Sequence, residues 1–170
     1  MSAATDLLID AFGRIREAVH EAVDGLTPDQ LDFRPDSQAN SIGWLVWHLT
    51  RIQDDHIAGV AGKGQVWTAE GWADRFGLPL SQADHGYGHS ADQVAVVRVK
   101  SGELLTAYHD AVYEQTIHYV RHLADADFTR VVDSSWDPPV TLGVRLVSVI
   151  SDDLQHAGQA AYLRGLILLQ

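Results

Sequence analysis

Two side chains that could bind a metal ion lie four residues apart near the end of the chain, Asp152 and His156. On an α-helix this spacing places them one turn apart on the same face, where a carboxylate and an imidazole can share one ion. Asp153 forms an i,i+3 pair with the same histidine, and spacing alone does not exclude it. Because solvated pairs with these spacings are common on helix surfaces, a metal site requires a further ligand from elsewhere in the chain.

His48 can supply that ligand, because it is an imidazole within the strongly apolar segment Trp44-Leu45-Val46-Trp47-His48-Leu49. A lone histidine in such a segment is more often a neutral core residue bonded to a backbone carbonyl. A catalytic metal site, however, needs about three protein ligands and an open position, which two facing helices can provide. Together, His48, Asp152 and His156 therefore predict such a site.

Asp55 and Gln159 are weaker candidates for catalytic or pocket roles, together with the aromatic residues of segment 61–90. Asp55 follows His48 by two helical turns, or roughly 10 Å. Because that separation is too long for both side chains to bind one ion directly, we expect Asp55 beside the pocket or, as a charged group, on the surface.

Two further pairs of histidines could be mistaken for metal ligands. His118 and His122 have helical metal spacing, but they lie to one side of the apolar stripe of their predicted helix, which favours a solvated face. His85 and His89 flank Gly86-Tyr87-Gly88 and could line the mouth of a pocket. Histidines in loops are mostly exposed, so we do not expect them to bind the ion.

The composition limits the possible chemistry and partners. The 170 residues include no cysteine, so a thiolate metal cage and a cysteine nucleophile are excluded and a metal must rest on histidine and carboxylate. The formal net charge of −11 opposes binding to a phosphate backbone. Neither a Gly-rich phosphate loop nor a Gly-x-Ser-x-Gly or dinucleotide motif occurs. We therefore expect a small-molecule substrate and no nucleic-acid partner.

The length of the chain fits a single domain over residues 1–170. Its first residues lack the basic segment and apolar run of a secretion signal, and no run of about 18 apolar residues suggests a membrane span. These features predict a cytoplasmic protein without a membrane partner.

Apolar residues recur at intervals of three and four in four segments, which is the pattern of amphipathic helices. The cap candidates Asn40-Ser41 and Thr141 precede the second and the fourth of these segments. The predicted helices span residues 4–24, 42–60, 101–123 and 141 to the end of the chain. This arrangement is typical of an all-α four-helix bundle, whose interior commonly holds ligands projected from facing helices.

The connections between these helices are less regular. Residues 61–100 form a long Gly- and aromatic-rich connection that we expect to contain short elements, among them a helix over 68–76. The valine-rich segment 94–99 fits a helix or a strand equally well. A single helical turn is predicted after Thr27-Pro28, and residues 125–136 are predicted to be extended.

Three motifs distinguish this sequence from an arbitrary bundle: Asn40-Ser41-Ile42-Gly43-Trp44-Leu45-Val46-Trp47-His48-Leu49, His156-Ala157-Gly158-Gln159 and Tyr162-Leu163-Arg164-Gly165. Leu26-Thr27-Pro28 and Tyr87-Gly88-His89 extend the pattern over nearly the whole chain. In this combination the chain resembles the DinB-like (YfiT-like) superfamily, and within it the branch related to mycothiol-dependent maleylpyruvate isomerase.

The resemblance implies an up-down-down-up bundle that holds a divalent metal, often zinc or nickel, through one ligand on the second long helix and two on the last. His48 and His156 correspond to the first and the last of these ligands. The middle ligand is usually His, or Glu in the isomerase branch, whereas this chain has Asp152. Aspartate keeps an anionic ligand but shortens the side chain by one methylene.

The resemblance also implies an enzyme in which the metal activates a low-molecular-weight thiol such as mycothiol, for transfer to a small electrophile or for its isomerisation. Two neutral imidazoles, one carboxylate and a divalent ion leave a single positive charge, which a thiolate would neutralise. The alternatives are a metal-dependent hydrolase and a non-catalytic, dimeric metal-binding bundle. We expect the protein to be a homodimer.

Overall fold

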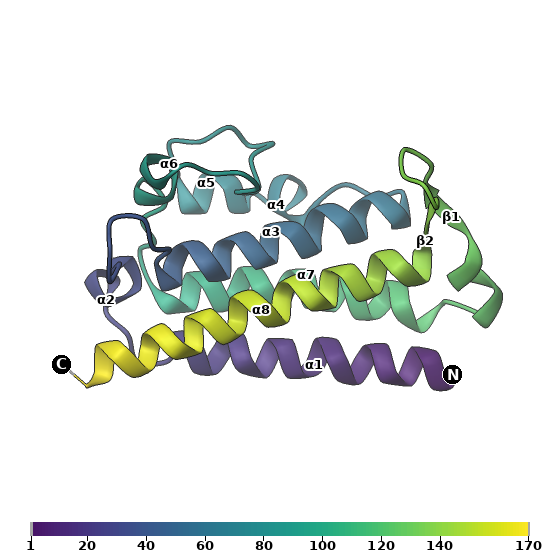
Figure 1. The fold of residues 1–170 in the computed structure, drawn as a ribbon, viewed down its shortest axis with the longest axis horizontal. Coiled ribbons are helices and arrows are strands. Elements are labelled where there is room, and N and C mark those ends of the chain that lie inside the picture. The colour runs from purple at the N-terminus through teal and green to yellow at the C-terminus, as the bar shows by residue number, and fades with distance from the viewer. Residues whose placement is uncertain (1, 170) are drawn as a thin grey trace.

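Four long helices form the body of the protein in the computed structural model, which describes residues 2–169 (Figure 1). Their bounds lie within a few residues of those predicted from apolar periodicity and cap residues. The helices are α1 (Ala3–Val23), α3 (Ile42–Ala61), α7 (Gly102–Arg121) and α8 (Leu142–Leu168).

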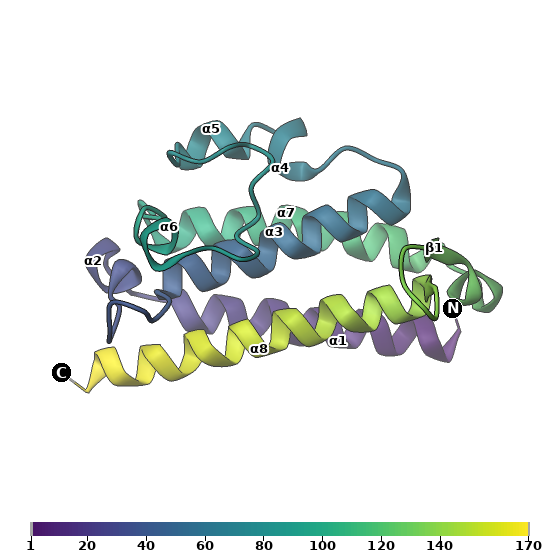
Figure 2. The same ribbon diagram turned by 45° about the horizontal axis from the view of Figure 1, so that its top comes forward.

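The direction of the helices follows the predicted order. Figures 1 and 2 show that α3 and α7 run in one direction, whereas α1 and α8 run in the other. Helix α1 packs mainly against α7 and α8, and α3 packs against the same two helices. The prediction of an all-α, up-down-down-up bundle is therefore confirmed.

Side-chain caps fix where the two helices that carry the candidate ligands begin. The Ser41 hydroxyl accepts a hydrogen bond from the Trp44 backbone N–H at 3.1 Å and starts α3. The Thr141 hydroxyl does the same for Val144 at 3.4 Å and starts α8. Helix α3 ends at Ala61 and is followed by Gly62, whose φ of 64° is left-handed and suits glycine.

The core lies between the four helices and continues beneath the long connection. Phe12 and Ile15 of α1, Trp47 of α3, Tyr108 of α7 and Leu146 of α8 are almost completely buried. Each large apolar side chain buried in this way contributes roughly 1.5–3 kcal/mol, which holds α3 and α8 side by side.

The long connection contains three short helices, α4 (Val66–Ala69), α5 (Trp72–Phe76) and α6 (Ala91–Ala95). The prediction of one helix over 68–76 was wrong, because Gly71 adopts a left-handed φ of 72° and separates α4 from α5. The valine-rich segment 94–99 forms neither a full helix nor a strand, since α6 ends at Ala95.

The segment before α8 also differs from the prediction of an extended chain over 125–136. It begins with the 3₁₀ helix η1 (Asp125–Thr129), where the Asp127 carboxylate accepts a hydrogen bond from the Ala124 N–H at 2.8 Å. Only β1 (Val131–Asp133) is extended, and it pairs antiparallel with β2 (Val140–Thr141).

The remaining short helix is α2 (Pro28–Asp32), which begins at the predicted Thr27-Pro28 cap. None of the helices within residues 2–169 combines the length and the apolar character that a membrane span requires.

One buried polar side chain in the bundle has consequences for stability. His109 of α7 is fully buried, and neither ring nitrogen forms a hydrogen bond within residues 2–169. Burial is the main cause that lowers the pKa of His109 to about 4. The charge of Asp110 raises this pKa, whereas the nearby charges of His20 and Arg16 on α1 lower it further. His109 is therefore neutral in the folded protein at neutral pH.

We predict that His109 makes the folded state less stable as the pH falls from about 6.5 toward about 4. In this window the unfolded chain binds a proton on this histidine and the folded chain does not. The unfolding free energy of the wild type should therefore fall by roughly 2 kcal/mol relative to that of His109→Leu between neutral pH and a pH of about 5. Urea unfolding at several pH values measures it, with exposed His118→Leu as the control. Parallel curves for the wild type and His109→Leu would contradict the prediction.

Candidate metal centre

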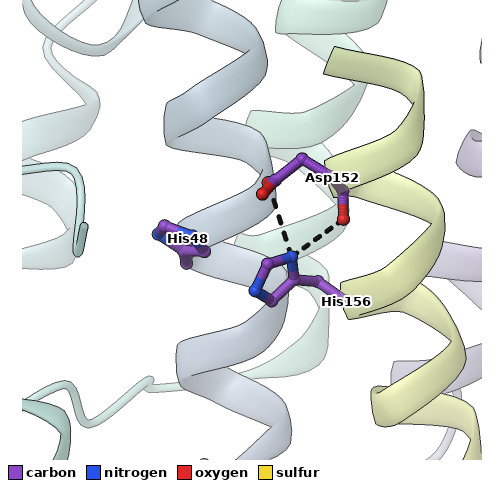
Figure 3. Close-up of side chains that lie close together, drawn as sticks. All are labelled: His48, Asp152 and His156. Carbon is purple, nitrogen blue, oxygen red and sulfur yellow. Dashed lines mark hydrogen bonds and ion pairs between the residues drawn. The ribbon is translucent and has the colours of Figure 1, made fainter. Parts of the chain in front are cut away.

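The three predicted ligands come together where α3 crosses α8. His48 projects from α3, while Asp152 and His156 project from successive turns of α8 toward it (Figure 3). One potential ligand atom from each residue lies within 4.8 Å of the other two. His48 is buried and the other two are half-buried, so the cluster lies at the edge of the core.

Backbone carbonyl groups determine which nitrogen of each imidazole is available. The Nδ1 atom of His48 lies 2.6 Å from the His85 carbonyl oxygen, and Nδ1 of His156 lies 2.8 Å from the Asp152 carbonyl oxygen. A carbonyl can only accept, so each Nδ1 carries the hydrogen and donates it. Each Nε2 is left with a free lone pair, which is the form of histidine that binds a metal.

The charges of the three side chains also suit a cation. Burial lowers the pKa of His48 to about 4, so its imidazole is neutral at neutral pH. Burial raises the pKa of Asp152, but contact with His156 and the attraction of both histidines outweigh it, leaving the pKa below its ordinary value. Asp152 is therefore an anion beside a neutral ligand.

The pKa of His156 is raised, in contrast to those of His48 and Asp152. Burial lowers it, but the side-chain and backbone contacts with Asp152 outweigh burial and leave it raised. Without an ion, the raised pKa of His156 and the lowered pKa of Asp152 both favour an oppositely charged pair, so a bound cation would compete with the proton of His156.

Asp153, the rival to Asp152, does not belong to the cluster. It is fully buried on the core side of α8, and neither carboxylate oxygen has a hydrogen-bond partner among the described residues. Burial, followed by the repulsion of Asp152, raises its pKa well above the ordinary value, which favours the neutral acid form of Asp153. The buried stripe through Leu146, Val149 and Ala157 contains this position, a signal in the sequence that could have excluded it.

The loop at residues 84–89 closes the other side of His48. The Asp84 carboxylate accepts hydrogen bonds from the Gly86 N–H and from His89 Nε2, both at 2.9 Å. Nδ1 of His89 accepts a hydrogen bond from the Trp44 indole at 3.1 Å. The indole of Trp44 also stacks on the His48 ring, with centroids 4.6 Å apart. The imidazole of His48 is thus held on one face and at Nδ1.

Gly86 is the closest point of this loop to His48. Its φ of +89° is a conformation that favours glycine, and a Cβ atom at this position would lie 2.7 Å from His48 Nδ1 and 3.0 Å from the Trp47 ring. No other residue type therefore fits without moving the loop away from the histidine.

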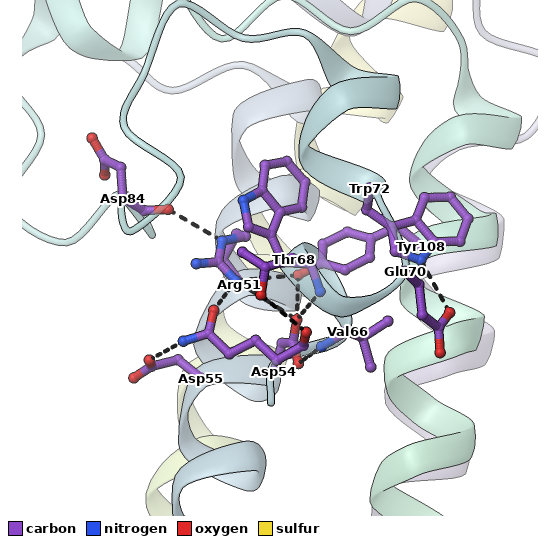
Figure 4. A network of polar contacts seen from close by, with 11 residues as sticks. Arg51, Asp54, Asp55, Val66, Thr68, Glu70, Trp72, Asp84 and Tyr108 are labelled. Atoms are coloured by element: carbon purple, nitrogen blue, oxygen red, sulfur yellow. Dashed lines mark hydrogen bonds and ion pairs between the residues drawn. The ribbon is translucent and has the colours of Figure 1, made fainter. Parts of the chain in front are cut away.

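A buried arginine anchors the start of the same loop to α3 (Figure 4). The Arg51 side chain is fully buried and donates from Nε to the Asp84 carbonyl oxygen at 3.1 Å. Its Nη1 donates to Gln65 at 2.8 Å, and the guanidinium lies 3.7 Å from Asp54. Asp54 in turn accepts hydrogen bonds from the backbone of α4 and from the Tyr108 hydroxyl. This network connects α3 to the loop at Asp84, to α4 and to α7.

A hollow of about 290 Å³ opens beside the three ligands. Sequence reasoning missed the contributions of Trp44 and of the Gly86 backbone, because neither carries a group that binds metals. His89, one of the two loop histidines that could line the mouth of a pocket, does line the hollow. Its side chain is almost completely buried. The lining residues are Asn40, Trp44, His48, Gly86, Tyr87, Gly88, His89, Asp152 and His156.

Of the weaker candidates, Tyr87 of segment 61–90 lines this hollow, whereas Asp55 and Gln159 lie outside it. Asp55 accepts a hydrogen bond from Gln65 at 2.6 Å and lines a separate hollow with His56 and Arg145. Gln159 is exposed one turn beyond His156. His118 and His122 are also exposed, as predicted for a solvated face.

The three side chains fit a divalent metal ion. Within the described part of the chain, Asp152 Oδ2 is buried without a hydrogen bond, and its neighbour is His156 Nδ1 at 3.4 Å. A buried carboxylate oxygen without a hydrogen bond is costly, and a bound cation would relieve that cost. One nitrogen from each imidazole and a carboxylate oxygen of Asp152 form a set of three hard or borderline ligands, the composition of catalytic rather than structural zinc sites.

In the comparison with known proteins, residues 11–160 match the DinB superfamily. This chain belongs to the DinB superfamily. A crystal structure described as the conserved protein of a locus from Enterococcus faecalis is similar over 100% of this chain and 99% of that chain, with 30% sequence identity and a TM-score of 0.93. None of the curated proteins matches the chain. The superfamily is confirmed, whereas the isomerase branch within it stays a prediction.

In this DinB-superfamily protein, we predict that Gly86→Ala weakens zinc binding by roughly 10–100-fold, the usual effect of losing a partner that orients a ligand. The added Cβ would push the loop from His48 and break the Nδ1 hydrogen bond to His85. Competition with a chromophoric chelator measures the affinity. Gly88→Ala is the matched control, since its φ is also positive, at +73°, but no atom lies within 4 Å of the added Cβ. Equal affinities of the two variants would refute the role of Gly86.

Proposed function

We propose that this protein is a divalent-metal-dependent enzyme that activates a low-molecular-weight thiol for attack on a small electrophile. The observation that carries the proposal is the convergence of His48, Asp152 and His156 within 4.8 Å at an open hollow. Membership in the DinB superfamily, whose members often bind metals, supports the same reading. Zinc or nickel is the expected metal, and mycothiol is the expected type of thiol.

The side chains supply a defined electrostatic setting for this chemistry. A divalent ion held there would act as a Lewis acid that lowers the pKa of a thiol or of water. His48 and His156, held by their Nδ1 hydrogen bonds, contribute neutral Nε2 atoms, and Asp152 contributes one negative charge. The site therefore keeps a single positive charge, which favours an anionic nucleophile in a half-buried hollow.

Thiol chemistry is favoured over hydrolysis by the shortage of proton acceptors in the hollow. His89, the further imidazole of the lining, uses Nε2 to contact Asp84 and Nδ1 to accept from Trp44. Asp152 is the one carboxylate of the lining and belongs to the ligand set. A thiolate is a nucleophile without further help, whereas attack by water commonly uses a nearby general base.

The two alternatives follow from the same site. The ion could activate water in a metal-dependent hydrolase, or the bundle could be a non-catalytic dimer in which Asp152 has ended catalysis. A homodimer stays a prediction in every case.

We predict that protein purified without a nickel column binds about one equivalent of divalent metal. His48→Ala and Asp152→Ala should each lower zinc affinity at least roughly 100-fold, because each removes one of three ligands. His118→Ala, which removes an exposed histidine, should leave the affinity unchanged. Elemental analysis and chelator competition provide the measurements. Much less than one equivalent in the wild type, together with no loss in His48→Ala, would eliminate the metal centre.

We predict that the metal-loaded protein accelerates conjugation or isomerisation of electrophiles only when a thiol is present. Mycothiol, bacillithiol and glutathione, each with a panel of electrophiles, can be compared by following loss of the free thiol and formation of product. Asp152→Ala should abolish the acceleration through loss of the ion. Product that forms at the same rate without any thiol would support the hydrolase instead.

A further inference from the structure

A second hollow adjoins the one beside the metal ligands. It has a volume of about 180 Å³ and is lined by Ala39, Asn40, Leu45, Gln159, Tyr162 and Leu163. Asn40 lines both hollows, so they are neighbours across a single residue. We call the second hollow the distal groove.

The distal groove follows α8 away from the ligands. His156, Gln159 and Leu163 are spaced by three and four residues, which places them along one face of the helix. From His156 to Leu163 the helix rises roughly 10 Å. A molecule that extends along this face from the ligands would therefore reach the near side of the groove, at Gln159, after roughly 5 Å and its far side, at Leu163, after roughly 10 Å.

Hydrogen bonds from Arg34 hold the opposite wall in place. Arg34 donates from Nε to the Ala39 carbonyl oxygen at 2.5 Å and from Nη1 to the Ala91 carbonyl oxygen at 3.2 Å. These bonds connect the segment before α3 to the end of the long connection. The groove is thus preformed, as small-molecule sites usually are.

The chemistry of the two hollows differs. The one beside the ligands contains Asp152 and three imidazoles, whereas none of the six residues of the distal groove is charged. In a chain with a net charge of −11, an uncharged groove favours an uncharged occupant. Tyr162 is 69% exposed, which leaves its ring free to cover an apolar group.

We propose that the distal groove binds the uncharged, apolar or aryl part of the substrate while a metal-binding group of the same molecule contacts the ion at His48, Asp152 and His156. The substrate class is then an elongated small molecule, with a polar reactive end and an apolar end roughly 10 Å apart. This inference rests on the proposed metal centre. Together the two hollows fall in the lower half of the usual range for small-molecule sites, roughly 300–1,000 Å³.

Two hydroxamates test the proposal on the zinc-loaded protein by calorimetry. Acetohydroxamate has only the metal-binding group, whereas phenylbutanohydroxamate adds a phenyl tail long enough to reach the groove. We expect the wild type to bind the tailed compound at least about tenfold more tightly. Tyr162→Ala should reduce this preference to about twofold or less, and Ala39→Asp should do the same by adding a charge. Neither variant should change the affinity for acetohydroxamate.

Trp136→Ala is the matched control, because Trp136 is 66% exposed and lines neither hollow. Equal affinities of the wild type for the two compounds, or an equal loss of preference in Trp136→Ala, would overturn the distal groove while leaving the metal centre intact. Failure of acetohydroxamate to bind would overturn both. Sedimentation at the same concentrations detects a second copy of the chain, and loss of the tail preference as a dimer forms would assign the groove to that copy and overturn the proposal.

Discussion

The hydrogen bond from His48 Nδ1 to the His85 carbonyl oxygen is the constraint on which the candidate site depends. It connects a helix of the bundle to the loop that covers it, and it leaves Nε2 of His48 free to bind an ion. The loop can supply this carbonyl only because its own backbone is held in two ways. Within the loop, the Asp84 carboxylate accepts hydrogen bonds from Gly86 and His89. From α3, Arg51 donates a hydrogen bond to the Asp84 carbonyl oxygen.

Burying Arg51 is costly, and the structure compensates the cost with contacts that also order the loop. A buried guanidinium requires paired charges and hydrogen bonds, which Asp54, Gln65 and the Asp84 carbonyl supply. The arginine also lies over the Trp67 ring, 5.0 Å from its centroid. Because one side chain contacts α4, α7 and the loop, the position of His85 is set by the core rather than by the loop alone.

The long helices were predictable because they depend on local periodicity. Caps at Ser41 and Thr141 and apolar residues every three or four positions determine them, whereas helical spacing left both Asp152 and Asp153 open as partners of His156. The breaks at Gly71 and the η1 turn were not predictable in the same way, since each depends on a single backbone conformation or side-chain cap. The roles of Arg51 and Gly86 required the three-dimensional path of a loop that carries no periodic signal.

The neighbouring aspartates of α8 show how one helix face separates two chemically identical residues. Asp152 points toward His48 and His156, which lower its pKa against burial, whereas Asp153 points into the apolar core, where burial raises its pKa. The rotation of about 100° between successive helical residues is sufficient for this difference. One carboxylate is therefore kept anionic at the ligand position and the other neutral. A cation at the cluster would consequently meet a single negative charge, which leaves part of its own charge for a nucleophile on the open side.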